Sequence, residues 1–575
     1  MIRLTDCFKA YTEDQDKAAS PRETVARVRR ALEDKCSGVL EETRRVDTGR
    51  LGIPVFLSVC GPAAREVMPT RKQMGKGASP EQAEASALME LVERFSYFSF
   101  WAREENFEYL RWSEAKRKFG PALMDVSEIL HSVGEDLPRD QAEAVLDLMR
   151  WRFHPALDVA AGVERQVPLD WFKRLNEFNG SSAGNSFEES ILQGACELVE
   201  RHVSARIDRE RPALPTLDPA SFHDPVLARL CACFKDNGVH LLLKDFTLGL
   251  PVPTVGALAY DPATFPGLSE IVFTAGTAAS PAKAAIRAVT EVAQLAGDFQ
   301  TGRIYEASGL GKFLELDETR WLEQGPLASL DSLPGVEDRN ILRELESLAR
   351  GLKVQGFTLY SVDTSHPDLG VTTNYNFVPG FEFRERTLQR SLGLFVGRAL
   401  AEEAEPEEAG RGLAVIAKAY PGAPFVPFFQ GMLQLRLEHF APAAARFAEA
   451  ENLQPEANER AMAAFYQAYA MTRAGLWEES IPHLDRALGH DPDIKEIFNL
   501  RGVARFKLKR YTEAAEDFQA ALNLDSGSAP DLANLGLCHK FLGHTAEALD
   551  YLGTALELDP DLDWARPHYE ELLKA

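Results

Sequence analysis

The sequence predicts an α/β (α+β) domain followed by an all-α solenoid of helical repeats. Short apolar strands alternate with helices over the first 400 residues, whereas residues 424–575 repeat one pair of helices with a nearly fixed period. Charge divides the chain in the same way. Of the net charge of −24, the last 175 residues carry −13 (16 basic and 29 acidic) and the first 400 carry −11. The two parts are therefore expected to be different kinds of domain.

The order of these features predicts three segments. The first domain is expected over residues 1–385, a helical and acidic linker over 386–423, and the repeats over 424–575. In the first domain the apolar runs GIPVFLSVC, HLLLKDF, TVGALAY, SEIVFTAG and GFTLYSVD are expected to be strands, and residues 22–34 an amphipathic helix. The stretch EEAEPEEAG, residues 402–410, is the acidic part of the linker.

Four similar segments make up the C-terminal part. They close at Pro455, Pro492, Ser526 and Pro560, which are spaced by 37, 34 and 34 residues. Each has a small residue where two paired helices must approach closely: Gly431, Ala468, Gly502 and Gly536. The pattern resembles tetratricopeptide repeats, in about four units, with a capping helix at residues 562–573. That resemblance implies a groove for a peptide or partner protein; the alternative is a structural or dimerising extension that makes a homodimer.

Composition excludes several classes of protein. A chain this acidic is unsuited to general binding of nucleic acid or an anionic membrane. No apolar run has the length of a membrane span, and the first 20 residues lack the apolar core of a signal peptide. The seven cysteines are odd in number and scattered, which argues against a disulfide framework. We expect a cytoplasmic protein.

The pentapeptide ELVER occurs twice, at Glu90–Arg94 and at Glu197–Arg201, and a related EVAQ begins at Glu291. Each copy follows a Gly-containing lead-in and a serine that can cap a helix: Ser79, Ser186 and Ser280. Three helices are thus expected to begin after Gly-containing turns. Such helix starts leave backbone N–H groups free to meet anions.

Polar residues of these helices are expected to form one stripe on each. The stripes are Ser86, Glu90 and Glu93; Glu189, Gln193, Glu197 and Glu200; and Arg287, Glu291 and Gln294. Carboxylates in a row on an otherwise apolar helix are costly without a cation, and Mg²⁺ binds carboxylates and phosphates together. The pattern predicts that Glu90, Glu93, Glu197 and Glu200 hold two Mg²⁺ ions that bridge nucleotide phosphates. The alternative is a solvated face with local salt bridges, which the duplication disfavours.

The same residues resemble the motifs of the YcaO family. Its Ser-x3-Glu-x2-Glu-Arg hallmark is matched by Ser86, Glu90, Glu93 and Arg94. The second motif is matched by Asn179, Gly180, Ser182, Asn185, Glu189, Glu197, Glu200 and Arg201, and the third by Arg287, Glu291 and Gln294. The resemblance covers residues 24–381.

What this resemblance implies is an ATP- and Mg²⁺-dependent, cyclodehydratase-like enzyme of post-translational modification. Such enzymes phosphorylate the carbonyl oxygen of a backbone amide after a nucleophile attacks it, which yields an azoline or, with external sulfide, a thioamide. By position, ATP would contact Lys76, Ser86, Ser182, Asn185, Glu189, Arg201, Arg287, Glu291 and Gln294. Glu90, Glu93, Glu197 and Glu200 would hold Mg²⁺. No covalent nucleophile is expected, because catalysis rests on positioning and electrostatics.

The C-terminus departs from the azoline-forming members of the family. Those members commonly end in a proline-rich tail, whereas this chain ends HYEELLKA after a repeat array. The departure favours the subgroup that carries C-terminal helical repeats, one member of which is an accessory factor for β-methylthiolation of a ribosomal protein. Three hypotheses remain: an amide-activating enzyme whose repeats recruit a substrate or partner, a nucleotide-binding accessory factor, and a repeat scaffold with a vestigial site. The acidic repeats favour a basic protein partner.

Overall fold

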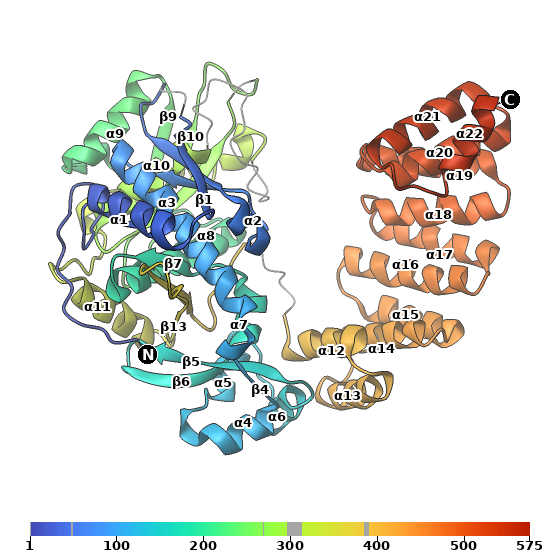
Figure 1. Cartoon of the computed structure of the whole chain (residues 1–575), viewed down its shortest axis with the longest axis horizontal. Coiled ribbons are helices and arrows are strands. Elements are labelled where there is room, and N and C mark those ends of the chain that lie inside the picture. Colours follow the sequence, from blue (N-terminus) through green and yellow to red (C-terminus); the bar gives the residue numbers. More distant parts are fainter. Residues whose placement is uncertain (1, 48–49, 268, 296–312, 385–389, 575) are drawn as a thin grey trace. The chain divides into compact units, whose positions relative to one another are not determined.

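The computed structural model describes residues 2–47, 50–267, 269–295, 313–384 and 390–574. The chain forms two compact units (Figure 1). One consists of residues 1–136 and 150–389, and the other of residues 137–149 and 390–575. The prediction of a mixed α/β domain followed by an all-α helical array is confirmed.

Three sheets form the framework of the first unit. The first has the order β1-β2-β3, the second β11-β10-β9-β8-β12 and the third β4-β5-β13-β14-β7, with β6 paired to β5. All pairings are antiparallel except that of β12 with β8. The strands are β1 (Leu40–Arg45), β2 (Val55–Cys60), β3 (Lys72–Lys76), β4 (Glu108–Leu110), β5 (Trp151–Asp158), β6 (Val163–Pro168), β7 (Ser181–Gly184), β8 (Thr216–Leu217), β9 (His240–Asp245), β10 (Thr254–Tyr260), β11 (Val272–Thr277), β12 (Leu327–Ala328), β13 (Tyr360–Asp363) and β14 (Thr372–Phe377).

Helices alternate with these strands. The α-helices of the first unit are α1 (Pro21–Lys35), α2 (Pro62–Val67), α3 (Pro80–Ala102), α4 (Trp112–Phe119), α5 (Val126–His131), α7 (Leu169–Asn176), α8 (Phe187–Glu210), α9 (Pro225–Asp236), α10 (Pro281–Leu295) and α11 (Ile341–Val354). Short 3₁₀ turns lie at Glu104–Asn106, Gly120–Ala122, Pro219–Ser221, Leu316–Thr319 and Leu330–Ser332.

The three motif helices are built in the same way. Strand β3 leads into α3, β7 into α8 and β11 into α10, and each of these strands carries a glycine against the helix that follows. A Cβ added at Gly75, Gly184 or Gly276 would lie 2.0, 2.4 or 2.3 Å from the backbone nitrogen of Ala87, Ser190 or Ala288. Only glycine allows strand and helix backbones to approach this closely. The Gly-containing lead-ins therefore dock each helix on its own strand.

Apolar side chains bury the rest of these helices. Ile191, Leu198 and Val203 of α8 share a core with Leu345 and Leu348 of α11. Helix α10 contributes a second core, with the α9 side chains of Leu227, Leu230 and Phe234. Because the apolar faces are taken up by these cores, the polar stripes are left to line a common space between α3, α8 and α10.

The second unit is a stack of helices (Figure 1). It contains α6 (Arg139–Leu146), α12 (Leu392–Glu403), α13 (Pro406–Ala419), α14 (Phe425–Arg436), α15 (Phe440–Leu453), α16 (Ala457–Arg473), α17 (Trp477–His490), α18 (Lys495–Lys507), α19 (Tyr511–Leu524), α20 (Ala529–Leu542), α21 (Thr545–Leu558) and α22 (Arg566–Lys574). In three of the repeats the two helices approach each other closely at the predicted glycine. A Cβ on Gly431, Gly502 or Gly536 would come within 2.8, 2.9 or 2.8 Å of Phe447, Phe518 or Leu552.

Two segments extend this stack beyond the repeats. The region expected as a linker, residues 386–423, forms α12 and α13 in its described part, and these pack on each other and on α14. Helix α6 also belongs to this unit, although the sequence places it within the first domain. Its apolar side chains Ala142, Val145 and Leu146 are buried, and its neighbours are α12 and α13. About 250 residues of chain lie between α6 and its partners. Local sequence patterns do not reveal contacts between segments this far apart, so α6 could not be assigned to the second unit from the sequence.

Two further predictions from the sequence concern disulfide bonds and membrane spans. All seven cysteines are free thiols, as their scattered positions suggest. Among the described residues no helix has the length and apolarity needed to cross a bilayer.

Lys244 supplies a test of the pH dependence of folding. Its side chain is buried on β9, where the ammonium donates to Thr216 Oγ1 at 2.8 Å and to the Gln324 carbonyl at 2.6 Å. Burial lowers its pKa from 10.5 to about 8. Between these values the unfolded chain binds a proton that the folded chain does not, so stability rises with pH from about 8 towards 10.5. Lys244→Met should remove this rise.

The measurement is the melting temperature of both proteins between pH 7 and 10. As the pH rises, we expect the melting temperature of the wild type to increase by several degrees relative to that of Lys244→Met. Each kcal/mol of stability corresponds to about 2–4 °C in melting temperature. Lys235→Met, on an exposed lysine of α9, is the matched control and should run parallel to the wild type. Parallel profiles for Lys244→Met as well would contradict the lowered pKa.

Candidate functional site

A polar pocket of about 340 Å³ lies between α3, α8 and α10, a volume typical of small-molecule sites. Twelve of the thirteen predicted site residues line it: Lys76, Ser86, Glu90, Glu93, Asn185, Glu189, Glu197, Glu200, Arg201, Arg287, Glu291 and Gln294. The side chains that form one predicted stripe on each helix thus line a common pocket. The caps predicted at Ser79 and Ser186 are present, because Ser79 Oγ accepts from the N–H of Gln82 and Ser186 Oγ accepts from that of Glu189, each at 3.2 Å.

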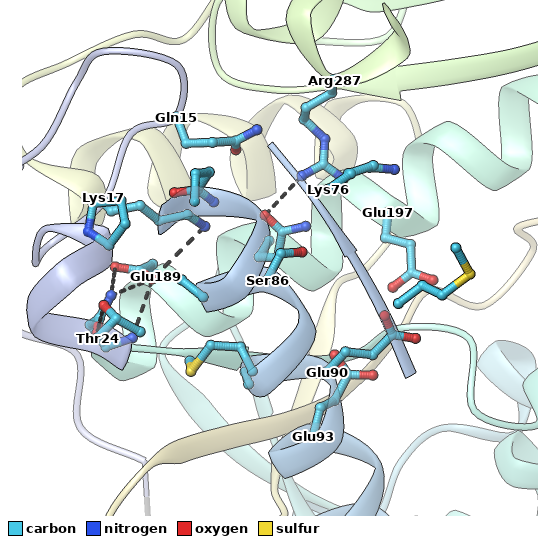
Figure 2. A pocket seen from close by; sticks show the side chains of 18 of the residues that line it. Gln15, Lys17, Thr24, Lys76, Ser86, Glu90, Glu93, Glu189, Glu197 and Arg287 are labelled. Atoms are coloured by element: carbon cyan, nitrogen blue, oxygen red, sulfur yellow. Dashed lines mark hydrogen bonds and ion pairs between the residues drawn. The ribbon is translucent and has the colours of Figure 1, made fainter. Parts of the chain in front are cut away.

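The two ELVER copies form the carboxylate side of the pocket. Figure 2 shows Glu90 and Glu93 of α3 opposite Glu197 of α8. Each copy carries its own arginine: Arg94 lies 3.8 Å from Glu90 and 3.4 Å from Glu93, and Arg201 donates to Glu197 Oε1 at 2.9 Å. These local ion pairs are the ones expected of a solvated face. The carboxylates nevertheless point into a shared pocket, which a solvated face does not predict.

Burial on this side of the pocket makes the charged form of two carboxyl groups unfavourable. Desolvation raises the pKa of Glu93 well above its usual value, against the opposing influence of Arg94. It also raises the pKa of Glu200, whose Oε2 accepts from the N–H of Thr277 at 2.9 Å. Carboxylates in this state are stabilised by an added cation. The side chain of Glu93 is only 14% exposed, so bulk water cannot replace that cation.

Cationic groups of β3 and α10 form the adjoining wall. The guanidinium of Arg287 donates to Gln193 Oε1 at 3.1 Å and lies 3.9 Å from Glu200. Its Nε is buried and has no hydrogen-bond partner among the described residues. Lys76 pairs with Glu291, and desolvation lowers the pKa of Lys76 to about 7, with Arg287 as the second cause. Two cations in one cramped space favour an anionic ligand, which would supply the missing acceptor for Arg287.

The opposite end of the pocket has a different character. Figure 2 shows Lys17, Thr24 and Glu189 there, with Ser86 between them and the carboxylate side. The carboxylate of Glu189 is already engaged, since it accepts from Asn185 Nδ2 at 2.9 Å and from the N–H of Ala18 at 2.8 Å. This end is therefore suited to neutral hydrogen-bonding groups rather than to a second cation.

Ser182 is the predicted site residue that the pocket excludes. Its Oγ is buried, accepts from Asn376 Nδ2 at 2.9 Å, and lies 3.3 Å from Ser190 Oγ. It joins β7 to β14 and to the start of α8, so the structure places it behind the pocket wall. A direct contact of Ser182 with a nucleotide is accordingly not supported.

The lining also includes residues outside the predicted set, among them Gln15, Lys17 and Gln193. Gln193 lies on the predicted α8 stripe, so its spacing could have identified it. Gln15 and Lys17 come from an irregular segment ahead of α1, where no helical period points to a shared face. Only the tertiary path of that segment brings them to the pocket.

The donor set of the pocket suits a Mg²⁺ ion that shares its shell with a ligand. Among the described residues no group of three or more metal-ligating side chains is close enough to hold an ion by itself. Mg²⁺ usually takes one or two carboxylates and completes its shell with water and substrate phosphates. Carboxylates from two helices that face one pocket, next to a wall that favours an anion, fit that mode of binding.

These features define a protein with a nucleotide-type pocket on three strand–helix units, joined to a helical solenoid. The family model described as YcaO cyclodehydratase, ATP- and Mg²⁺-binding, matches residues 74–382, more than half of the chain. The chain therefore belongs to the YcaO family, and its cofactors are ATP and Mg²⁺. A tetratricopeptide-repeat model matches residues 496–527 and 532–562, within α18–α21.

Relatives of known sequence cover different shares of the chain. An uncharacterised protein of Methanothermobacter thermautotrophicus is 28% identical over 64% of this chain and 95% of its own length. The ribosomal protein S12 methylthiotransferase accessory factor YcaO of Escherichia coli is 29% identical over 33% of this chain and 35% of its own. Whole-protein activities are thus not transferred by these matches alone.

One solved structure shares the fold of the first unit. A heterocyclase in complex with substrate and cofactor superposes with a TM-score of 0.51 at 19% identity, over 66% of this chain and 54% of that one. The YcaO protein of Methanopyrus kandleri, bound with AMPPCP and Mg²⁺, covers 66% of this chain and 95% of that one, with a TM-score of 0.48 at 24% identity.

Proposed function

We propose that this protein is an ATP- and Mg²⁺-dependent enzyme that activates a backbone amide of a peptide or protein by phosphorylating its carbonyl oxygen. The observation that carries this proposal is the polarity of the pocket: paired glutamates from two helices at one side, and Lys76 and Arg287 beside them. That arrangement suits a triphosphate with its metal. The far end, with Asn185 and Lys17, suits a nucleoside.

In the proposed reaction the protein's groups position and neutralise. A deprotonated thiol or hydroxyl of the substrate, or sulfide, adds to the amide carbon; the resulting oxyanion attacks the γ-phosphorus of ATP, and ADP departs. Phosphate then leaves the carbon together with the proton on nitrogen, which gives an azoline, or, where sulfide has added, with the proton on sulfur, which gives a thioamide. Mg²⁺, when bound, would offset phosphate charge. Glu90, Glu93, Glu197 and Glu200 would hold it, and Arg287 would orient the phosphates.

The repeats are proposed to recruit the substrate or a partner. The net charge of −10 over residues 424–575 (14 basic and 24 acidic) favours a basic polypeptide through long-range attraction. Because exposed charges are screened by salt, that contact should weaken between about 50 and 500 mM salt.

The test of the proposal is Mg²⁺-dependent binding of a non-hydrolysable ATP analogue, followed by ADP release with candidate peptides. We expect analogue binding that disappears when Mg²⁺ is chelated, and ADP release that rises when a substrate peptide is added. Absence of analogue binding at ample Mg²⁺ would remove the site assignment.

One specific observation favours a second candidate, a nucleotide-binding accessory factor for β-methylthiolation of a ribosomal protein: the resemblance to the Escherichia coli accessory factor. This candidate expects analogue binding without peptide-stimulated turnover. ADP release that appears only when a methylthiotransferase and its ribosomal protein are added would select it over the first.

A further inference from the structure

The segment ahead of α1 forms a closed loop. Tyr11 and Lys17 pair as an antiparallel bridge, with the Lys17 carbonyl accepting from the N–H groups of Ala10 and Tyr11 at 2.9 and 3.1 Å. The Lys17 N–H donates back to the Tyr11 carbonyl at 2.9 Å. We call residues 11–17 the N-terminal loop. Its Gln15 and Lys17 line the nucleotide pocket.

The loop and the residue after it contact the beginnings of all three motif helices. Asp14 accepts from the N–H of Ala78, next to the cap of α3, at 2.9 Å. On α10, Lys283 Nζ donates to the carbonyls of Thr12 and Glu13 at 2.9 and 2.6 Å. On α8, Glu189 accepts from the N–H of Ala18 at 2.8 Å. One short loop thus links three helices that come from distant parts of the chain.

Among the loop residues that make these contacts, Asp14 has a buried side chain that is held by hydrogen bonds on both carboxylate oxygens. It is 2% exposed, and its second carboxylate oxygen accepts from the Tyr11 hydroxyl at 2.8 Å. Burial and the nearby Asp14 charge raise the pKa of Tyr11, so its hydroxyl stays a donor at neutral pH. The carbonyl of Ala78 is fixed in turn by Arg229 at 2.9 Å. Both oxygens of Asp14 therefore have defined donors, one within the loop and one on the turn before α3.

We propose that Asp14 is a positioning residue for the nucleotide site. By joining the loop to the turn between β3 and α3, it sets Gln15 and Lys17 opposite Lys76 and Ser86 across the pocket. The proposal rests on the proposed binding of ATP. Coupling between two sites is reciprocal, so a loop that favours the nucleotide must itself be stabilised when the nucleotide binds.

Asp14→Asn tests this with almost no change in shape. The amide oxygen can still accept from the N–H of Ala78, but the NH₂ then meets the Tyr11 hydroxyl, which must reverse its hydrogen bond and act as the acceptor. The carboxylate charge that strengthened both hydrogen bonds is lost. We expect Mg²⁺-dependent affinity for a non-hydrolysable ATP analogue to fall about tenfold, while kcat at saturating ATP stays within about twofold. Amide hydrogen exchange in residues 5–19 should be faster in the variant, and in the wild type the analogue should slow it.

Glu13→Gln is the matched control. It removes one negative charge from the same loop, and its side chain is exposed, so affinity and exchange should both match the wild type. Should Asp14→Asn not fold, Tyr11→Phe removes only the hydroxyl bond to Asp14 and is expected to weaken the analogue about threefold.

The outcomes separate this inference from the proposed function. If the wild type binds no analogue, the proposed function is wrong, and the positioning role of Asp14, which depends on it, is wrong as well. If the wild type binds and the folded Asp14 variant binds equally, with unchanged exchange in residues 5–19, the positioning role is wrong and the nucleotide site stands. Equal weakening by Asp14→Asn and Glu13→Gln would also overturn it, since loop charge rather than the hydrogen bonds would then be the cause.

Discussion

Replacing Glu197 by glutamine is expected to lower kcat/KM for ATP by about 10²- to 10³-fold and to abolish the dependence of nucleotide binding on Mg²⁺. Glutamine has nearly the shape of glutamate and lacks the charge that a hard cation requires. Glu90→Gln, on the facing helix, should have an effect of the same size, because the pocket brings both side chains to its carboxylate side. The measurement is a Mg²⁺ titration of analogue binding together with ADP release.

Glu210→Gln provides the matched control on the same helix. This residue lies at the end of α8, far along the helix from the pocket, and its partner is Arg206 at 3.2 Å on the surface. We expect its kinetics to equal those of the wild type. If the Glu90 and Glu197 variants kept the wild-type response to Mg²⁺, the metal would have to bind elsewhere and the meaning of the duplicated motif would change.

The site could be predicted from the sequence to the extent that it is made by helices. Positions four and seven residues after Ser86 necessarily share its face, so Glu90 and Glu93 followed from spacing alone. The duplication at Glu197 then indicated a second wall, since one solvated face has no reason to occur twice with the same cap. Neither inference needed the tertiary structure.

What could not be predicted was set by the path of the chain between elements. Lys17 reaches the pocket from an irregular loop, and the segment is held there by the bond from Ala18 to Glu189, 171 residues away. Ser182 is the opposite case: it belongs to a motif, but side chains alternate along a strand, and its own contacts Ser190 of α8 and Asn376 of β14 rather than lining the pocket. Helix α6 joins the repeat unit for reasons of packing that no local pattern records.

The second large effect concerns the glycines beneath the motif helices. Gly75→Val is expected to lower the free energy of unfolding of the first unit by more than about 3 kcal/mol, or to prevent folding. Valine favours strands by up to about 1 kcal/mol, so propensity alone predicts the opposite sign. The Cβ would nevertheless lie 2.0 Å from the nitrogen of Ala87 and 2.3 Å from the carbonyl oxygen of Ala83. These are backbone atoms of α3, and they cannot move without displacing Glu90 and Glu93.

Denaturant unfolding with the bound analogue as a second probe distinguishes the possible causes. Gly276→Val should repeat the effect on α10, because its Cβ would lie 2.3 Å from the nitrogen of Ala288. Gly410→Ala is the control: it sits inside α13, where the nearest atom is 4.0 Å from the added Cβ, and it should stabilise the second unit by about 0.5–1 kcal/mol. The contrary result would be that Gly75→Val folds with wild-type stability and full Mg²⁺-dependent binding. That result would show that close contact between strand and helix is not required. The reason for glycine at these positions would then have to be contact with the ligand rather than packing of the helix.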